Sequence, residues 1–282
     1  MTAREFLRIG PAERPSCWTW TVGPQVLTRA GAMQGGALLA GAIVALEEVA
    51  QRPLAWVTGQ YLRHVGEGVR VDVEVTLDVV GHLMTQAHAV VSAGDDVLAR
   101  VLGGLGEREF STSGTWIQPP VVPLPGDCPP ALDGAGMPRR DVWELVTASG
   151  RSLPDLDGAP GPGRSASWCR IPGGARLVEA ADLAIAGDYL MTHFASAVGR
   201  PCTGNSLDNT VRVGAPDATE WILVDAEVHS VTRGIGHGTA HLWSEGGTFL
   251  GTASQTLVLR DVGADGLSSR SNRRIVDSRS DI

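Results

Sequence analysis

The sequence predicts an α+β protein made of two similar halves, each with one long buried helix wrapped by antiparallel strands. Each half has one apolar helical stretch followed by several runs of strand composition. The second half also repeats a pattern of the first, since a shift of 153 residues superposes Val71–Thr76 on Val224–His229 and Gly81 on Gly234. Because the order of helix, strand and turn is kept around these matches, we interpret them as an internal repeat.

In the first half, residues 37–50 predict a helix that is apolar on nearly all sides and therefore buried on several of them. Small residues along this helix would let a curved sheet approach closely. Gly35 and Gly36 at its start leave backbone N–H groups open, which suits them to bind a carbonyl oxygen or a phosphate, although a glycine pair can also simply form a turn. The strands of this half are predicted at 18–27, 54–65, 69–80, 85–92 and 97–105.

We divide the chain into four parts. An N-terminal unit spans residues 1–110, a Pro/Gly-rich linker 111–164, a C-terminal unit 165–262 and a flexible tail 263–282. The linker is expected to contain at most a short helical turn near 141–148. In the C-terminal unit, an alanine-rich helix is predicted over 179–198, between a first strand at 167–171 and the later strands.

Composition excludes several classes of function. The net charge of −8 disfavours nucleic acid and anionic membranes as partners. The chain has no lysine, so it cannot use a Schiff base, a pyridoxal-phosphate lysine or a P-loop lysine. Its four cysteines have no CxxC spacing, and we expect no metal and no cofactor. The N-terminus does not resemble a signal peptide and no apolar run has membrane-spanning length, so we expect a cytoplasmic protein with reduced thiols.

The polar residues of most interest lie between residues 204 and 260. They are Asp208 in a Gly-Asn-Ser-Leu-Asp-Asn segment, His229 on an alternating strand, and Gln255 in an otherwise apolar last strand. We expect the three side chains to meet at one end of a long helix and to activate a water there. Each also has a structural alternative: Asp208 could cap a turn, His229 could be a hydrogen-bonded core residue, and Gln255 could satisfy a backbone group.

The internal repeat, the buried helix of each half and three short segments resemble the double-hotdog acyl-CoA thioesterases of type II, over roughly residues 16–260. The resemblance implies two fused hotdog folds with one continuous antiparallel sheet, a site between the halves, and hydrolysis of acyl-CoA thioesters by an activated water. The three segments are Gly204-Asn205-Ser206-Leu207-Asp208-Asn209, Glu220-Trp221-Ile222-Leu223 and Ala253-Ser254-Gln255-Thr256.

In that family an aspartate, a glutamine and a hydroxyl residue hold the water, and these positions fall on Asp208, Gln255 and His229. The histidine departs from the family pattern. In this interpretation Asp208 accepts the proton of the water, Gln255 orients the water, and His229 takes or relays a proton near neutral pH. The N–H groups near Gly35 and Gly36 would bind the oxygen that becomes negative. The sequence contains no Gly-x-Ser-x-Gly segment, which disfavours a serine hydrolase.

We expect one functional site per chain. Thr76 stands in the first half where His229 stands in the second, and Gly103-Gly104 occupies the place of Gln255. We further expect acyl-CoA or a carrier-bound acyl group as substrate, a role in fatty acid metabolism, an arginine among Arg63, Arg212 and Arg233 for the CoA phosphates, and a possible homo-oligomer. The alternatives are a dehydratase or hydratase acting on thioester-bound acyl chains, and a non-catalytic acyl-binding protein.

Overall fold

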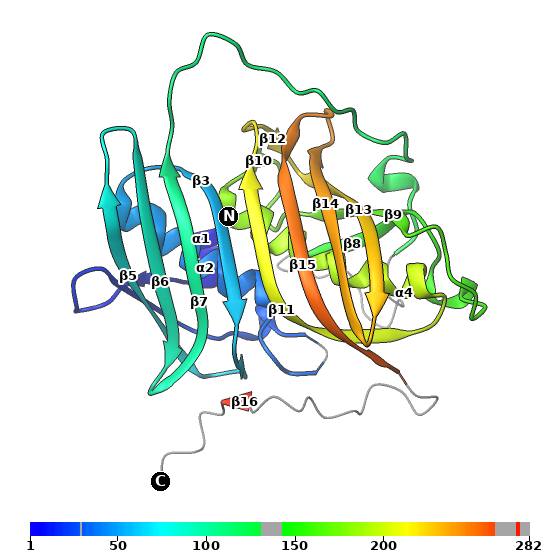
Figure 1. Ribbon diagram of the computed structural model, residues 1–282, viewed down its shortest axis with the longest axis horizontal. Coiled ribbons are helices and arrows are strands. Elements are labelled where there is room, and N and C mark those ends of the chain that lie inside the picture. Colours follow the sequence, from blue (N-terminus) through cyan, green and yellow to red (C-terminus); the bar gives the residue numbers. More distant parts are fainter. Residues whose placement is uncertain (29, 131–142, 263–274, 277–282) are drawn as a thin grey trace.

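The computed structural model describes residues 1–28, 30–130, 143–262 and 275–276. Within this part of the chain the main feature is one curved, antiparallel sheet of twelve strands (Figure 1). The first half contributes β1 (Gly10–Pro11), β2 (Cys17–Thr21), β3 (Leu54–Tyr61), β5 (Arg70–Val80), β6 (Met84–Ala93) and β7 (Asp96–Gly106). The second half contributes β8 (Glu144–Ser149), β9 (Arg164–Arg170), β11 (Cys202–Val213), β13 (Trp221–Thr232), β14 (Ile235–Ser244) and β15 (Phe249–Asp261).

Two short strand pairs lie outside this sheet. They are β4 (His64–Val65) with β16 (Ile275–Val276), and β10 (Arg176–Leu177) with β12 (Ala218–Thr219). Apart from β16, the expected tail at 263–282 lies outside the described residues. Single 3₁₀ turns occur at η1 (Pro24–Val26), η2 (Pro125–Asp127) and η3 (Leu153–Asp155).

The two halves use the same strand order in opposite directions. Across the sheet the order is β1-β2-β5-β6-β7-β3-β11-β15-β14-β13-β9-β8. Each half therefore places its first strand outermost and the strand after its helix at the centre. The halves join where β3 pairs with β11, and there the Thr58 and Thr210 hydroxyl oxygens lie 2.8 Å apart.

The first helix, α2 (Gly35–Ala50), is the one that the apolar stretch predicts. The second is shorter than expected. The segment predicted as one helix over 179–198 consists of α3 (Ala180–Asp188), a 3₁₀ turn η4 (Tyr189–Thr192) and α4 (His193–Val198). The Thr192 hydroxyl donates to the Tyr189 carbonyl oxygen at 2.7 Å, and such side-chain bonds to the backbone compete with regular helix. A further short helix, α1 (Ala3–Leu7), packs on α2.

The segment expected to be a linker is partly a strand. In place of a helical turn near 141–148, β8 forms the edge of the sheet by pairing with β9. The preceding residues cross the convex face of the second half, where the Trp168 indole N–H donates to the Pro123 carbonyl oxygen at 2.9 Å. They cover a small apolar cluster that includes Trp168, Leu223 and Trp243. Leu223 and Trp243 point away from the main core because their neighbours Val224 and Leu242 point into it.

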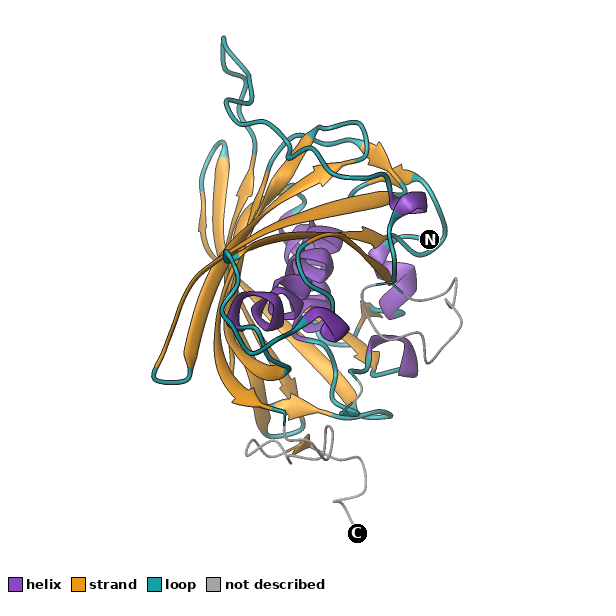
Figure 2. Ribbon diagram, turned by 90° about the vertical axis from the view of Figure 1, so that its right-hand side faces the viewer, coloured by secondary structure: helices purple, strands orange, loops and turns teal. Residues whose placement is uncertain are grey.

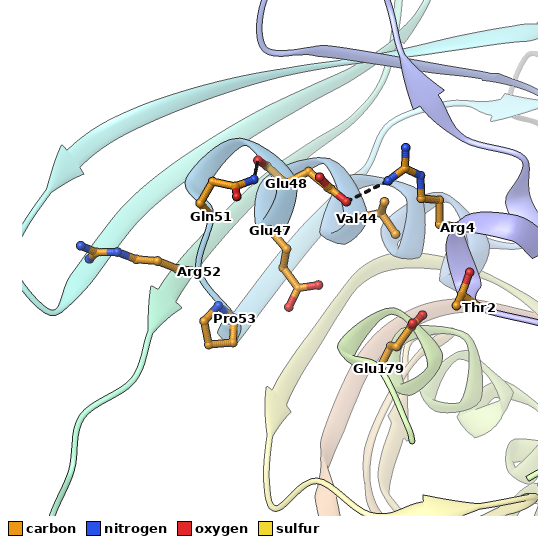
Figure 3. A pocket seen from close by; sticks show the side chains of 9 residues that line it. All are labelled: Thr2, Arg4, Val44, Glu47, Glu48, Gln51, Arg52, Pro53 and Glu179. Atoms are coloured by element: carbon orange, nitrogen blue, oxygen red, sulfur yellow. Dashed lines mark hydrogen bonds and ion pairs between the residues drawn. The ribbon is translucent and has the colours of Figure 1, made fainter. Parts of the chain in front are cut away.

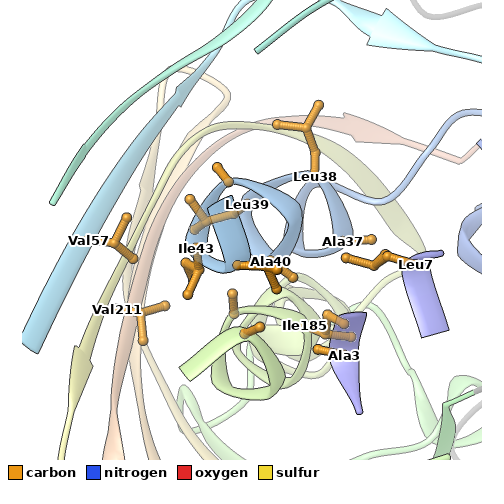
Figure 4. Packing of buried hydrophobic residues seen from close by; sticks show 14 of the residues in the cluster. Ala3, Leu7, Ala37, Leu38, Leu39, Ala40, Ile43, Val57, Ile185 and Val211 are labelled. Atoms are coloured by element: carbon orange, nitrogen blue, oxygen red, sulfur yellow. The ribbon is translucent and has the colours of Figure 1, made fainter. Parts of the chain in front are cut away.

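Helices α2 and α3 lie together on the concave side of the sheet (Figure 2). Leu39 and Ile43 of α2 face Val57 and Val211 at the centre of the sheet, and the opposite side of α2 faces Ile185 of α3 (Figure 4). No helix in the described part of the chain combines the length and apolar composition that a membrane crossing requires.

The two helices approach each other closely at Gly36. A Cβ atom built there would lie 2.6 Å from the Ala184 carbonyl oxygen and 2.6 Å from the Asp188 Cβ atom. Because backbone atoms of α3 cannot move aside as a flexible side chain can, glycine is required at this position. The start of α2 is thereby held directly against the end of α3.

We expect Gly36→Ala to lower the free energy of unfolding by about 1–3 kcal/mol, because the added methyl group overpacks the contact between the helices. Urea unfolding followed by circular dichroism measures this change. Gly126→Ala is the matched control, since a Cβ atom at Gly126 meets no atom within 4 Å. Equal stability of the two variants would contradict this account of the helix contact.

Candidate active site

A cluster of polar side chains lies on the concave side of the sheet, where α2 begins and α3 ends. Its centre is a hydrogen bond of 2.7 Å from the Gln255 side-chain nitrogen to the Asp188 carboxylate. Asp188 is the last residue of α3, and Gln255 lies on β15. Asn209 on β11 is the direct cross-strand partner of Gln255, so the cluster combines groups from one helix and two strands.

Opposing effects act on the pKa of the Asp188 carboxylate. Burial raises its pKa above the ordinary value, while the Gly36 backbone N–H and the Gln255 amide donate hydrogen bonds that oppose the rise. Asp188 lies at the carboxyl end of α3, where a negative charge is disfavoured, but also at the amino end of α2, where a negative charge is favoured. The result is a carboxylate with a raised proton affinity on a partly exposed residue, a property that is common among catalytic general bases.

Asn209 is the most deeply buried polar residue of the cluster, with an exposed fraction of 0%. Among the described residues, neither its side-chain nitrogen nor its side-chain oxygen has a hydrogen-bond partner, and the same is true of the Gln255 side-chain oxygen. A buried polar group without a partner costs about 1–3 kcal/mol, so such groups are rare outside functional sites. Both amides belong to the same small region of the structure.

Tyr61 completes the cluster from β3. Its hydroxyl donates to the Gly35 carbonyl oxygen at 2.9 Å and so joins the centre of the sheet to the start of α2. Burial raises the Tyr61 pKa well above its ordinary value, and the charges of Asp188 and Asp208 add to the rise, while the neighbouring Asn209 amide opposes it. The Tyr61 side chain is therefore a neutral phenol at physiological pH.

The structure does not bring the three residues singled out in the sequence together. Gln255 points into the concave side, with an exposed fraction of 2%, and contacts Asp188 rather than Asp208. Asp208 lies at a β-bulge and accepts a hydrogen bond of 2.6 Å from the Thr256 backbone N–H. His229 is exposed, and its Nε2 atom lies 3.0 Å from the Thr239 hydroxyl oxygen.

The position of His229 follows from the alternation of its strand. Val224 and Ala226 point into the core and Asp225 and Glu227 point outward, so His229 continues the outward series. A β-bulge follows Val228, and the contact of His229 with Thr239, which alternates with the core residue Ala240, shows that His229 still points outward. Strands β14 and β15 also separate β13 from β11, and three strand spacings place the backbones of His229 and Asp208 about 14 Å apart.

The two glycines proposed to bind an oxyanion have other contacts. The Gly36 N–H acts on the Asp188 carboxylate, and the Gly35 carbonyl oxygen accepts the Tyr61 hydroxyl. The start of α2 therefore anchors Asp188 and Tyr61. Of the three arginines considered for the CoA phosphates, Arg63 pairs with Asp96 at 3.1 Å, whereas Arg212 and Arg233 are exposed.

Sequence reasoning missed Asp188, Asn209 and Tyr61. A signal for Asp188 was available, because it is the one charged residue between Leu183 and Leu190 in an otherwise apolar or aromatic stretch. Asn209 follows Asp208 directly, and strand alternation sends the two side chains to opposite faces. Tyr61 gives no signal of its own, since a tyrosine at a strand end is ordinary.

The opposite end of the helix pair holds a cavity of about 480 Å³ (Figure 3). Val44, Glu47, Glu48 and Glu179 line part of it, and Arg4 pairs with Glu48 at 3.0 Å. The Glu47 carboxylate accepts the Leu54 backbone N–H at 2.8 Å, and burial together with Glu179 and Glu48 raises its pKa. Its three carboxylates face two arginines, Arg4 and Arg52, which leaves one net negative charge and disfavours an anionic ligand or a carbonyl oxygen that gains negative charge.

The comparisons with known proteins agree with the fold. The family model of the acyl-CoA thioesterase C-terminal domain matches residues 125–259. The chain is 29% identical in sequence to a protein from Novosphingobium aromaticivorans that is assigned as a thioesterase. That structure matches with a TM-score of 0.76, covering 88% of this chain and 97% of the other. No curated protein matches the sequence.

Two further structures share the fold at lower identity. An acyl-CoA thioesterase II from Mycobacterium marinum is 16% identical, with a TM-score of 0.72 and coverage of 92% of this chain and 98% of the other. A hotdog-fold protein from Alicyclobacillus acidocaldarius is 18% identical, with a TM-score of 0.77 and coverage of 93% and 98%. Residues 125–259 thus resemble the C-terminal domain of acyl-CoA thioesterases, and nearly the whole chain shares the fold of a protein assigned as a thioesterase.

We expect Asp188→Asn to raise the free energy of unfolding at pH 7. The raised pKa means that the folded chain holds this proton more tightly than the unfolded chain. Stability therefore falls as the pH rises from the ordinary carboxyl pKa of 3.8 through the folded pKa, and the neutral amide avoids this loss. Urea unfolding between pH 4 and pH 8 should show a difference that disappears at the acidic end.

Asp217→Asn is the control of opposite sign. Hydrogen bonds from the Ser244 and Thr248 side chains lower the pKa of Asp217, so its ionised form stabilises the fold and the amide should be less stable at pH 7. If Asp188→Asn were instead less stable than the wild type at every pH, the carboxylate would be a structural group and the electrostatic argument would be wrong.

Proposed function

We propose that the chain hydrolyses acyl-CoA thioesters at the cluster of Asp188, Gln255 and Asn209. The observation that carries this proposal is the hydrogen bond of 2.7 Å from Gln255 to Asp188. It fixes a carboxylate of raised pKa beside two buried amides, on the side of the sheet that encloses the helices. The family supplies the substrate class: thioesters of coenzyme A.

The proposed reaction uses water as the nucleophile. Its oxygen attacks the thioester carbonyl carbon while Asp188 accepts one of its protons. When the tetrahedral intermediate collapses, the carbon–sulfur bond breaks and Asp188 returns the proton to the leaving thiolate. The products are a carboxylic acid and free coenzyme A. Gln255 holds Asp188 in place through one carboxylate oxygen, and the carboxylate keeps further lone pairs for the water.

Two of the residues from the sequence keep a part in this proposal. Gln255 positions the base, and Asp208 fixes the pairing of β11 with β15 through its bond to the Thr256 N–H. That pairing sets Asn209 opposite Gln255. His229 receives no role in the reaction, because its exposed ring lies on the convex side with Thr239 and His237.

We also infer that the halves are two fused hotdog units and that one of them carries the site. The reversed strand order and the join at β3 and β11 support the first point. The second is supported by the opposite end of the helix pair, where Val44 of α2 faces the start of α3 near Glu179 (Figure 3). This end of the helix pair holds no hydrogen-bonded carboxylate and amide pair like Asp188 and Gln255 among the described residues.

Release of free thiol from short-chain, medium-chain and aromatic acyl-CoAs tests the proposal. We expect Asp188→Asn to lower kcat/KM by about 10²–10⁴-fold, since it removes the general base. Gln255→Ala should lower kcat/KM by a smaller factor, because Gln255 acts through Asp188. Asp208→Asn should lower it by the smallest factor, because Asp208 acts only through the pairing of its strand. His229→Ala should stay within about threefold of the wild type, and it is the matched control on the other face of the sheet.

Absence of thiol release by the wild type from every acyl-CoA would refute the proposed function. If His229→Ala abolished release while Asp188→Asn preserved it, the activity would stand and the assignment of the site would be wrong. The Asp188→Asn result is informative only for folded protein, and the expected gain in stability of this variant guards against loss of activity through unfolding.

A further inference from the structure

The side-chain amide of Asn209 is completely buried between β3 and β15. In the described part of the chain neither of its polar atoms makes a hydrogen bond of ordinary geometry, although the amide lies close enough to the Tyr61 hydroxyl to oppose the rise in the pKa of that group. An apolar residue of the same size would avoid the cost of burying an unpaired amide. Asn209 nevertheless lies beside Gln255 and close to Tyr61, within the cluster that contains Asp188.

At the start of α2, the Gly36 N–H already donates a hydrogen bond to Asp188. A helix start normally supplies free N–H groups for a developing negative charge. Here the Gly36 N–H serves the Asp188 carboxylate, and a carboxylate at that position repels a second negative charge. This favours a donor from another element, and the buried Asn209 side-chain nitrogen, which makes no hydrogen bond of ordinary geometry, lies opposite Gln255 in the strand register.

We infer that Asn209 is a catalytic residue that donates a hydrogen bond to the thioester carbonyl oxygen as this oxygen becomes negative. The inference rests on the proposed function and adds the residue that stabilises the transition state. Asp188 and Gly35 are partly exposed, so the thioester approaches Asn209 from their side. In this arrangement Asp188 holds the attacking water, and Asn209 binds the carbonyl oxygen of the same thioester group.

Burial makes such a donor effective. In a water-free environment a fixed amide stabilises a developing charge far more than it would in solution, and removal of one such donor lowers kcat by about 10²–10³-fold. The ground-state carbonyl is only weakly polar and gains less from the same contact. Loss of the donor should therefore appear mainly in kcat, with KM within about threefold of the wild-type value.

Asn209→Leu is the decisive variant, measured by thiol release with the acyl-CoA that the wild type uses best. We expect kcat to fall by about 10²–10³-fold, KM to stay nearly constant, and the thermal midpoint to be equal or higher because the unpaired amide is gone. A merely structural Asn209 would lower the midpoint instead. Thr210→Val is the matched control on the same strand, since its side chain faces Thr58 on the other side of the sheet, and its kcat should not change.

Asn209→Ala is measured in the same way and covers the case in which leucine does not fit. A kcat within about threefold of the wild type for either folded variant would overturn the inference, as would a raised KM at unchanged kcat. Failure of both variants to fold would also overturn it, because the amide would then serve the fold. A wild type that releases no thiol would instead count against the proposed function, so the two failures are distinguishable.

Discussion

The structure depends on one close contact, the approach of the first turn of α2 to the last turn of α3 at Gly36. Without a side chain there, the backbone of one helix touches the backbone of the other, and the Asp188 carboxylate reaches the N–H group of Gly36. The positive end of one helix then offsets the negative end of its neighbour. The sheet curves around this helix pair. The polar cluster lies where the start of α2 and the end of α3 meet the central strands of the sheet.

Much of the fold could be predicted from the sequence because periodicity reports burial directly. The apolar stretch at the start of α2 and the alternation in β5 each specify one element without reference to the rest. The break after Asp188 could not be predicted in the same way. It depends on how α3 ends against α2, and a run of good helix formers gives no sign of a neighbouring helix.

The candidate site was harder to predict, since side chains from distant positions meet there only in the folded chain. Gln255 was found because an amide in an apolar strand is unusual. For His229 the family motif and the strand pattern disagree. The motif suggests a place in the site, but the alternation of Val224, Ala226 and Val228 sends His229 outward. Asp188 lies in a different element from every residue of the motif, so only the three-dimensional contact with Gln255 connects the two.

The segment between the halves forms part of the second half. It supplies the edge strand β8 and shields the indole rings of Trp168 and Trp243 from water. A second half that began at β9 would lack the edge strand β8. It would also expose the apolar cluster to solvent, which favours aggregation. The connection between the halves is therefore also a structural element of the second half, so shortening it would remove sheet edge and apolar cover together.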